Sequence, residues 1–149
     1  MKYYEDVEVG DTGVFEQEYA VTQEEIVEVG QRWDPQPFHI DPVAAKDSMF
    51  GGLVASSAHI FAIHCCIGTA KCDEDKNIAA ESALGFNNLQ WHSPVRPGDV
   101  IRSKYYVMSK RESSSRPSMG VVKTLTTLYN QSDETVFTIE TTFLAKKRQ

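Results

Sequence analysis

The fold is decided by residues 56–72, SSAHIFAIHCCIGTAKC, which form the most apolar helix candidate in the chain. Apolar side chains such as Ile60, Phe61, Ile63 and Ile67 lie nearly all round it. A helix of this kind in a globular protein is expected to be buried. We therefore expect the rest of the chain to pack around residues 56–72.

Four strand patterns follow this helix candidate and are separated by short turns. They cover approximately residues 84–93, 101–108, 121–129 and 137–143. The inward face of the last strand is marked by Phe137, Ile139, Thr141 and Phe143, because they alternate with other residues at a period of two. Consecutive strands joined by short turns form an antiparallel sheet. The pattern predicts an α+β fold in which an antiparallel sheet wraps around the long central helix.

Two further elements precede the central helix. Residues 14–20 are expected to form a strand, and Thr22 with Glu25 has the spacing of a capping box at a helix N-terminus. This helix is expected to stop near Asp34, because Pro35 disfavours helical dihedral angles in the residue before it.

The segment between the two helices contains the candidate catalytic groups. Residues 34–38 are expected to form a rigid, extended or turn-like loop with two prolines, which would hold Asp34 and His39 at fixed positions. Asp41 has the place of an N-cap for a helix at residues 43–48, so it is a cap and not a catalyst. A carboxylate, an imidazole and a helix N-terminus are the parts that acid–base chemistry needs.

Length and composition set the class of protein. The chain has 149 residues, which is the length of one ordinary domain. Its net charge of −6 argues against a general nucleic-acid binder. No apolar run opens the sequence, so we expect neither a signal peptide nor a membrane span. Cys65, Cys66 and Cys72 do not form a disulfide framework and are interpreted as core residues, which favours a reducing, cytoplasmic location.

Three motifs together carry a resemblance to a known family. They are Asp34-x-x-Pro37-x-His39-x-Asp41, Phe50-Gly51-Gly52 and Ser93-Pro94-Val95-x-x-Gly98-Asp99. From about Tyr4 to Lys146 the chain resembles the MaoC-like dehydratase family, which includes the (R)-specific enoyl-CoA hydratases and has the hotdog fold. The resemblance therefore implies one hotdog domain over residues 1–149.

The resemblance also implies an activity. It is the hydration of a trans-2-enoyl-CoA to a 3-hydroxyacyl-CoA, or the reverse, with Asp34 and His39 as the catalytic pair. The backbone N–H of Ser57 would stabilise the enolate oxygen, and Gly52, Phe50 and Ser56 would contact the substrate. Apart from coenzyme A as part of the substrate no cofactor or metal is implied, and the expected assembly is a homodimer or higher homo-oligomer.

One departure and several alternatives accompany this interpretation. Many family members have His-Gly where this chain has Ser56-Ser57, a change that bears on the fit of the acyl chain. The same fold also serves acyl-CoA thioesterases and non-catalytic acyl-binding proteins. The other imidazoles, His59 and His64, are interpreted as core or interface residues, and no role is assigned to His92.

The basic residues beyond the motifs have two interpretations. Lys110, Arg111 and Arg116 flank a serine-rich loop, where they would either meet the phosphates of coenzyme A or form a solvated hairpin tip.

Overall fold

The computed structural model describes the backbone of residues 1–149 and all side chains except that of Glu74. Its framework is a six-stranded sheet with the order β1-β4-β5-β6-β3, in which β2 also pairs with β4, and these strand pairs are all antiparallel. The strands are β1 (Thr12–Val14), β2 (Tyr19–Ala20), β3 (Ala80–Trp91), β4 (Val100–Glu112), β5 (Met119–Tyr129) and β6 (Thr135–Lys146).

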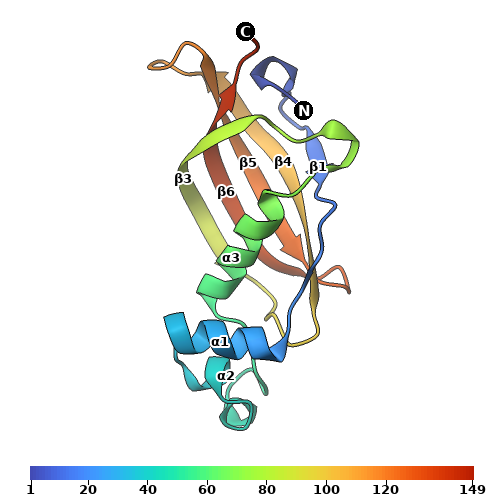
Figure 1. The fold of residues 1–149 in the computed structure, drawn as a ribbon, viewed down its shortest axis with the longest axis vertical. Coiled ribbons are helices and arrows are strands. Elements are labelled where there is room, and N and C mark those ends of the chain that lie inside the picture. Colours follow the sequence, from blue (N-terminus) through green and yellow to red (C-terminus); the bar gives the residue numbers. More distant parts are fainter.

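The helices lie on one side of this sheet. They are α1 (Gln23–Trp33), α2 (Pro37–Ile40), α3 (Ser57–Gly68) and the 3₁₀ helices η1 (Tyr4–Asp6), η2 (Ala44–Asp47) and η3 (Asp73–Asp75). Figure 1 shows α3 lying across one face of the sheet, with α1 and α2 beside its N-terminal end and both chain termini at the opposite end of the molecule. This confirms the α+β architecture with an antiparallel sheet around a central helix.

The core forms between α3 and the sheet. Ile60, Ile63 and Ile67 are buried on the inner face of α3, where they share a cluster with Phe137 and Ile139 of β6. Burying each of these side chains contributes about 1.5–3 kcal/mol relative to leaving it exposed. The period-two pattern of the last strand thus predicted its buried face.

The start of α1 explains its place against α3. The Thr22 side chain accepts a hydrogen bond from the Glu25 amide, as the predicted cap requires. The Glu25 carboxylate, however, accepts from the Tyr19 hydroxyl and lies 3.6 Å from Nε2 of His59. Only half of the predicted capping box is present, because this carboxylate lies between the tyrosine of β2 and the histidine of α3.

Several predicted boundaries differ from the structure. The strand expected at residues 14–20 is divided between β1 and β2, and the central helix ends at Gly68 instead of continuing to Cys72. The segment expected as an extended loop contains the short helix α2. The helix expected at residues 43–48 is the 3₁₀ helix η2, since Asp41 Oδ1 accepts from the amides of both Val43 and Ala44 and tightens the chain there.

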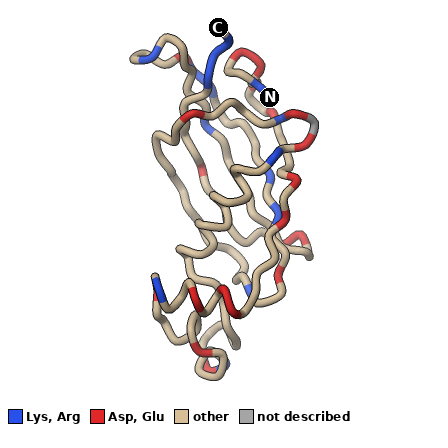
Figure 2. The backbone as a smooth tube through the Cα atoms, viewed as in Figure 1, with Lys and Arg blue, Asp and Glu red and all other residues tan. Residues whose placement is uncertain are grey.

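The burial of α3 is also less complete than predicted. Ala58, Ala62, Cys65 and Cys66 are exposed on its outer face. The interpretation of Cys65 and Cys66 as core residues is therefore wrong, whereas Cys72 is buried as predicted. Figure 2 shows no charged residue along α3, so this exposed face is uncharged.

Candidate active site

Asp34 and His39 are brought together where α1 ends and α2 begins. Asp34 is the C-cap of α1, and its amide donates to the Gly30 carbonyl. His39 lies one turn further on in α2, and its Nε2 is 3.5 Å from Oδ2 of Asp34. The His39 side chain is 8 % exposed and that of Asp34 37 %. The pair is therefore buried on the imidazole side and open on the carboxylate side.

The contact made by Nδ1, the other ring nitrogen of His39, determines which tautomer the ring adopts. Nδ1 lies 2.6 Å from the carbonyl oxygen of Val54. A carbonyl oxygen only accepts hydrogen bonds, so Nδ1 carries the proton in this contact. In the neutral ring Nε2 is then the unprotonated nitrogen, and it is the one that faces Asp34.

A pocket of about 540 Å³ lies against this pair. Its walls come from the α1–α2 segment, the loop after Phe50, the start of α3 and the end of β3. They include Asp34, Phe38, His39, Phe50, Ser57, Ile60, Trp91 and His92. The pocket thus places the carboxylate and the imidazole beside the N-terminus of a twelve-residue helix.

Ser57 is the first residue of α3 and lines this pocket. The preceding Ser56 caps the helix, since its hydroxyl accepts from the His59 amide. In the described part of the chain no hydrogen bond uses the Ser57 amide. Free amides and the helix dipole both favour negative charge at such a position, so the Ser57 N–H is placed to stabilise an anion.

The loop that leads into α3 is held by the turn at residues 94–99. Arg96 Nη2 donates to the Phe50 carbonyl at 2.7 Å, and the Ala55 amide donates to the Val95 carbonyl at 2.9 Å. Gly98 has a φ of +90°, a conformation that favours glycine. The Pro-Val-x-x-Gly-Asp motif therefore supports the loop beside the candidate site.

A close helix contact sets the position of His39. A Cβ atom placed on Gly30 of α1 would lie 2.8 Å from the carbonyl oxygen of His39 and 3.0 Å from its Cβ. The absence of a side chain at Gly30 lets α2 approach α1 closely enough for His39 to face Asp34.

The other predicted contact residues are placed differently. Phe50 and Ser57 line the pocket, whereas Gly52 and Ser56 are not among its lining residues. A Cβ on Gly52 would meet the Arg96 guanidinium, and Ser56 is 1 % exposed with its hydroxyl used as a cap.

Two residues that the sequence did not single out also line the pocket. Trp91 and His92 lie at the end of β3, and His92 Nε2 is 2.9 Å from Oγ1 of Thr138. Only the pairing of β3 with β6 brings this strand end beside α3, so no sequence motif marks it.

Side chains that could bind a metal ion or a phosphate are the other candidates for a functional role among the described residues. Among the residues described, no group of three or more His, Cys, Asp or Glu side chains is arranged to hold a metal ion. Lys110 Nζ donates to the carbonyls of Tyr4 and Val7, so its charge is used within the fold. No helix in the described part of the chain is long and apolar enough to cross a membrane.

Comparison with known proteins gives consistent matches. The family model described as "MaoC like domain" matches residues 6–129. The uncharacterized protein YdeM of Bacillus subtilis (strain 168) is 27% identical over 127 residues, which cover 85% of this chain and 87% of YdeM.

Solved structures resemble the whole chain. The MaoC-like dehydratase from Rhodospirillum rubrum has a TM-score of 0.88 and 31% identity, covering 100% of this chain and 99% of that one. The R-hydratase PhaJ1 from Pseudomonas aeruginosa has a TM-score of 0.72 and 21% identity, covering 98% of this chain and 86% of that one. The second likeness concerns the fold alone.

Proposed function

Because this chain belongs to the MaoC-like domain family, we propose that it is an acyl-CoA hydratase/dehydratase that interconverts a trans-2-enoyl-CoA and a 3-hydroxyacyl-CoA. The observation that carries the proposal is the facing of His39 Nε2 and Asp34 Oδ2 across 3.5 Å at the wall of a pocket. That separation is too long for a strong direct hydrogen bond, and it suits a water molecule held by both groups.

In the hydration direction His39 acts as the base. Its unprotonated Nε2 takes a proton from the water while the water oxygen bonds to C3 of the enoyl group. The electron pair of the C2–C3 double bond moves to give an enolate on the thioester oxygen. When the enolate collapses, C2 takes a proton from the Nε2–H of His39, and the ring returns to its starting state. Asp34 orients the water and stabilises the imidazolium.

The enolate oxygen is bound at the start of α3. The Ser57 N–H donates to it, and the positive end of the helix dipole adds to the stabilisation. Removing one donor of this kind from an enzyme costs about 10²–10³ in rate. Because the donor belongs to the backbone, serine supplies it as glycine would. Gly52 and Ser56 then act by shaping the loop that carries this amide.

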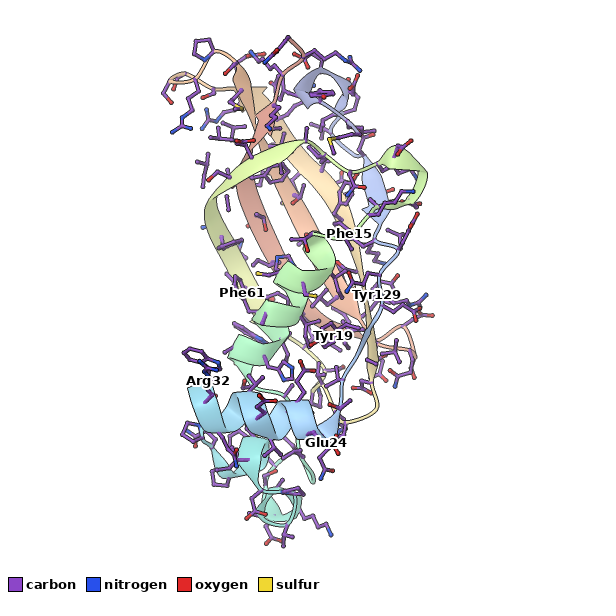
Figure 3. All side chains as sticks on the ribbon, in the orientation of Figure 1. Phe15, Tyr19, Glu24, Arg32, Phe61 and Tyr129 are labelled. Atoms are coloured by element: carbon purple, nitrogen blue, oxygen red, sulfur yellow. The ribbon has the colours of Figure 1, made fainter. Side chains whose placement is uncertain are left out.

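The protein is proposed to act as a homodimer on a coenzyme A thioester, without a metal or redox cofactor. Among the residues that the structure describes, β3 pairs only with β6 and leaves its other edge free, and Leu84 and Phe86 on it are exposed. A long free edge with apolar side chains is a place where a second copy adds its own strand. Phe61 of α3 lies toward β3 (Figure 3), and its ring meets Phe86 at a centroid distance of 5.3 Å. Such a dimer would extend the sheet and cover the uncharged outer face of α3.

The test is a hydration assay with purified protein. Trans-2-enoyl-CoA thioesters of several chain lengths are supplied, and loss of the conjugated enoyl absorbance is followed. We expect Asp34→Asn and His39→Ala each to lower kcat by about 10²- to 10⁴-fold. A parent protein that hydrates none of these thioesters, or variants as fast as the parent, would contradict the proposal.

Asp41→Asn provides the matched control for Asp34→Asn. The N-cap of η2 is Val43 and not Asp41, but Asp41 Oδ1 accepts from the amides of Val43 and Ala44 where η2 begins, and an asparagine oxygen accepts the same hydrogen bonds. This variant should keep the activity of the parent. A thiol reagent in parallel reactions detects free coenzyme A, whose release would indicate thioester hydrolysis instead of hydration.

A further inference from the structure

A second cavity of about 330 Å³ lies between the C-terminal half of α3 and the sheet. His64 and Gly68 line it from α3, and Figure 3 shows Phe15 beside this end of the helix. On the sheet side its wall includes Thr124, Thr126, Thr141 and Phe143. We call it the distal cavity.

Hydroxyl groups are concentrated on this part of an otherwise apolar face. Thr124 of β5 and Thr141 of β6 are paired opposite each other, and Thr126 follows at the next inward position of β5. Oγ1 of Thr141 and Nδ1 of His64 are both buried and have no hydrogen-bond partner among the residues described. Buried polar groups normally have a partner, so the wall of the distal cavity lacks one that a ligand would supply.

The missing partner is uncharged. No Lys, Arg, Asp or Glu is among the described residues that line the distal cavity. Burial lowers the pKa of His64 to about 4, so its ring is neutral at pH 7 and offers one donor and one acceptor. A carboxylate would be desolvated here without a counter-charge, which is costly. A hydroxyl or keto oxygen matches the groups present.

The distal cavity lies further along the same helix as the catalytic pocket. Ser57 lines the catalytic pocket and His64 the distal cavity, and the helical rise between them is about 10 Å. The ring of Phe137 contacts both Trp91, at a centroid distance of 5.3 Å, and His64, at 5.9 Å. Since Trp91 lines the catalytic pocket, the rings of Trp91, Phe137 and His64 lie in a row between the two spaces.

We propose that the distal cavity binds an uncharged oxygen substituent, a hydroxyl or keto group, at the far end of a medium-length acyl chain whose thioester lies between His39 and Ser57. His64 and Thr141 are the groups that hydrogen-bond this oxygen. The inference rests on the proposed function, because it takes the acyl thioester as the substrate. It defines the substrate class as oxygenated acyl-CoA thioesters, in place of plain hydrocarbon chains.

Binding of saturated thioesters tests the cavity independently of turnover, because these compounds cannot be hydrated. Isothermal titration calorimetry compares octanoyl-CoA with ω-hydroxyoctanoyl-CoA, the keto compound 7-oxooctanoyl-CoA and octanedioyl-mono-CoA. We expect the hydroxy or keto compound to bind about five- to tenfold more tightly than octanoyl-CoA, as one added neutral hydrogen bond would give. The dicarboxylic compound should bind most weakly. Equal or weaker binding of both the hydroxy and the keto compound would overturn the assignment.

Variants of Thr141 and His64 test whether these two side chains cause the preference for the oxygenated chain. Thr141→Val keeps the shape of the side chain but removes the hydroxyl, and His64→Leu removes the imidazole. Each should abolish the preference for the oxygenated chain while octanoyl-CoA binds as before. Thr141→Val should also melt at the same temperature as the parent or above it, because the lost hydroxyl has no partner in the unliganded protein. Thr127→Val is the control, since Thr127 lies on the other face of β5. A preference that survives both cavity variants would contradict their role.

A turnover assay distinguishes a failure of the distal-cavity assignment from a failure of the proposed reaction. Trans-2-octenoyl-CoA and its ω-hydroxy derivative are assayed with the parent protein. If neither is hydrated but the binding preference is present, the proposed reaction fails and the assignment of the distal cavity stands. If both are hydrated and no preference for the oxygenated chain is measured, the reaction stands and the cavity assignment fails.

Discussion

The three buried or half-buried imidazoles near the central helix differ in what surrounds their nitrogens. Both nitrogens of His39 face polar groups, the Val54 carbonyl and the Asp34 carboxylate. His59 Nε2 lies 3.6 Å from Glu25, which is too long for a hydrogen bond, and burial lowers the pKa of His59 more than Glu25 raises it. His59 is therefore neutral near pH 7, and its contact with Glu25 is not an ion pair. Only His39 has the partners that proton transfer requires.

The titration of His64 gives a prediction for stability. Burial lowers its pKa to about 4 in the folded protein, whereas in the unfolded chain the pKa is close to 6.5. Between these values the unfolded state binds more protons, so stability falls as the pH falls from about 6.5 to about 4. We expect a loss of about 2 kcal/mol from this residue between pH 7.5 and pH 5. Urea unfolding of the parent and His64→Leu at both pH values measures it, and equal pH dependence in the two proteins would contradict it.

Among the elements, the contact of α1 with α2 determines the geometry of the Asp34–His39 pair. Asp34 ends one helix, and His39 lies in the next, so their separation depends on how closely the two helices pack. Gly30 permits this packing because its Cα faces the backbone of His39. A glycine that sequence rules interpret as a mild weakness in a helix thus has a positioning role here.

Gly30→Ala should lower activity more than stability. The added methyl group forces α2 away from α1, and a shift of 1 Å at a catalytic group costs about 10²-fold in rate. We expect kcat with trans-2-butenoyl-CoA to fall by about 10- to 100-fold, with the clash partly offset by the higher helix propensity of alanine.

Gly68→Ala is the matched control for Gly30→Ala. A Cβ at Gly68 meets nothing within 4 Å, and the short butenoyl chain does not extend to the distal cavity. This control should be as active as the parent with that substrate. An unchanged kcat for Gly30→Ala would show that the contact does not position His39.

At the scale of the whole molecule, α3 and β3 both present exposed residues along their length. Ala58, Ala62, Cys65 and Cys66 on the helix are exposed without any neighbouring charge on the helix, and β3 is exposed along nearly its full length. Figure 2 shows the charged residues gathered instead at the two ends of the molecule and along the side of β1. This distribution is typical of a protein whose middle is covered by a second copy.

Ala62→Glu tests the dimer. Ala62 is exposed in a single chain, so the variant should fold, but in the proposed dimer an unpaired charge would be buried at a cost of about 3–5 kcal/mol. We expect the dimer dissociation constant to rise by about 10²-fold or more, measured by analytical ultracentrifugation. Val43→Glu also adds one charge in place of an exposed apolar residue, outside α3 and β3, and should stay dimeric. A parent that is monomeric at all concentrations would contradict the proposal.

Most of the fold was predictable because its signals are local. The period-two pattern of β6 and the apolar run of α3 each follow from neighbouring residues. The pairing of β4 with β5 and of β5 with β6 follows from the short turns between them, whereas β3 pairs with β6 and not with β4, its neighbour in the chain. The errors concern burial and boundaries, which depend on distant contacts. Cys65 and Cys66 are exposed because the sheet covers only one side of α3, and no local pattern distinguishes the two sides of a helix that is apolar all round.

The sequence alone determined the α+β architecture, the family and the pairing of Asp34 with His39 in one short segment, since hydrophobic period, helix stops and motif spacing are all encoded locally. Only the tertiary structure decided which nitrogen of His39 faces Asp34, because that depends on the Val54 carbonyl, fifteen residues away. It also decided that Trp91 and His92 line the same pocket and that Thr141 and His64 line a second one. These groupings arise from strand pairing and helix packing, which bring together residues that are far apart in the chain. The spacing of such residues in the sequence does not predict that they are close in space.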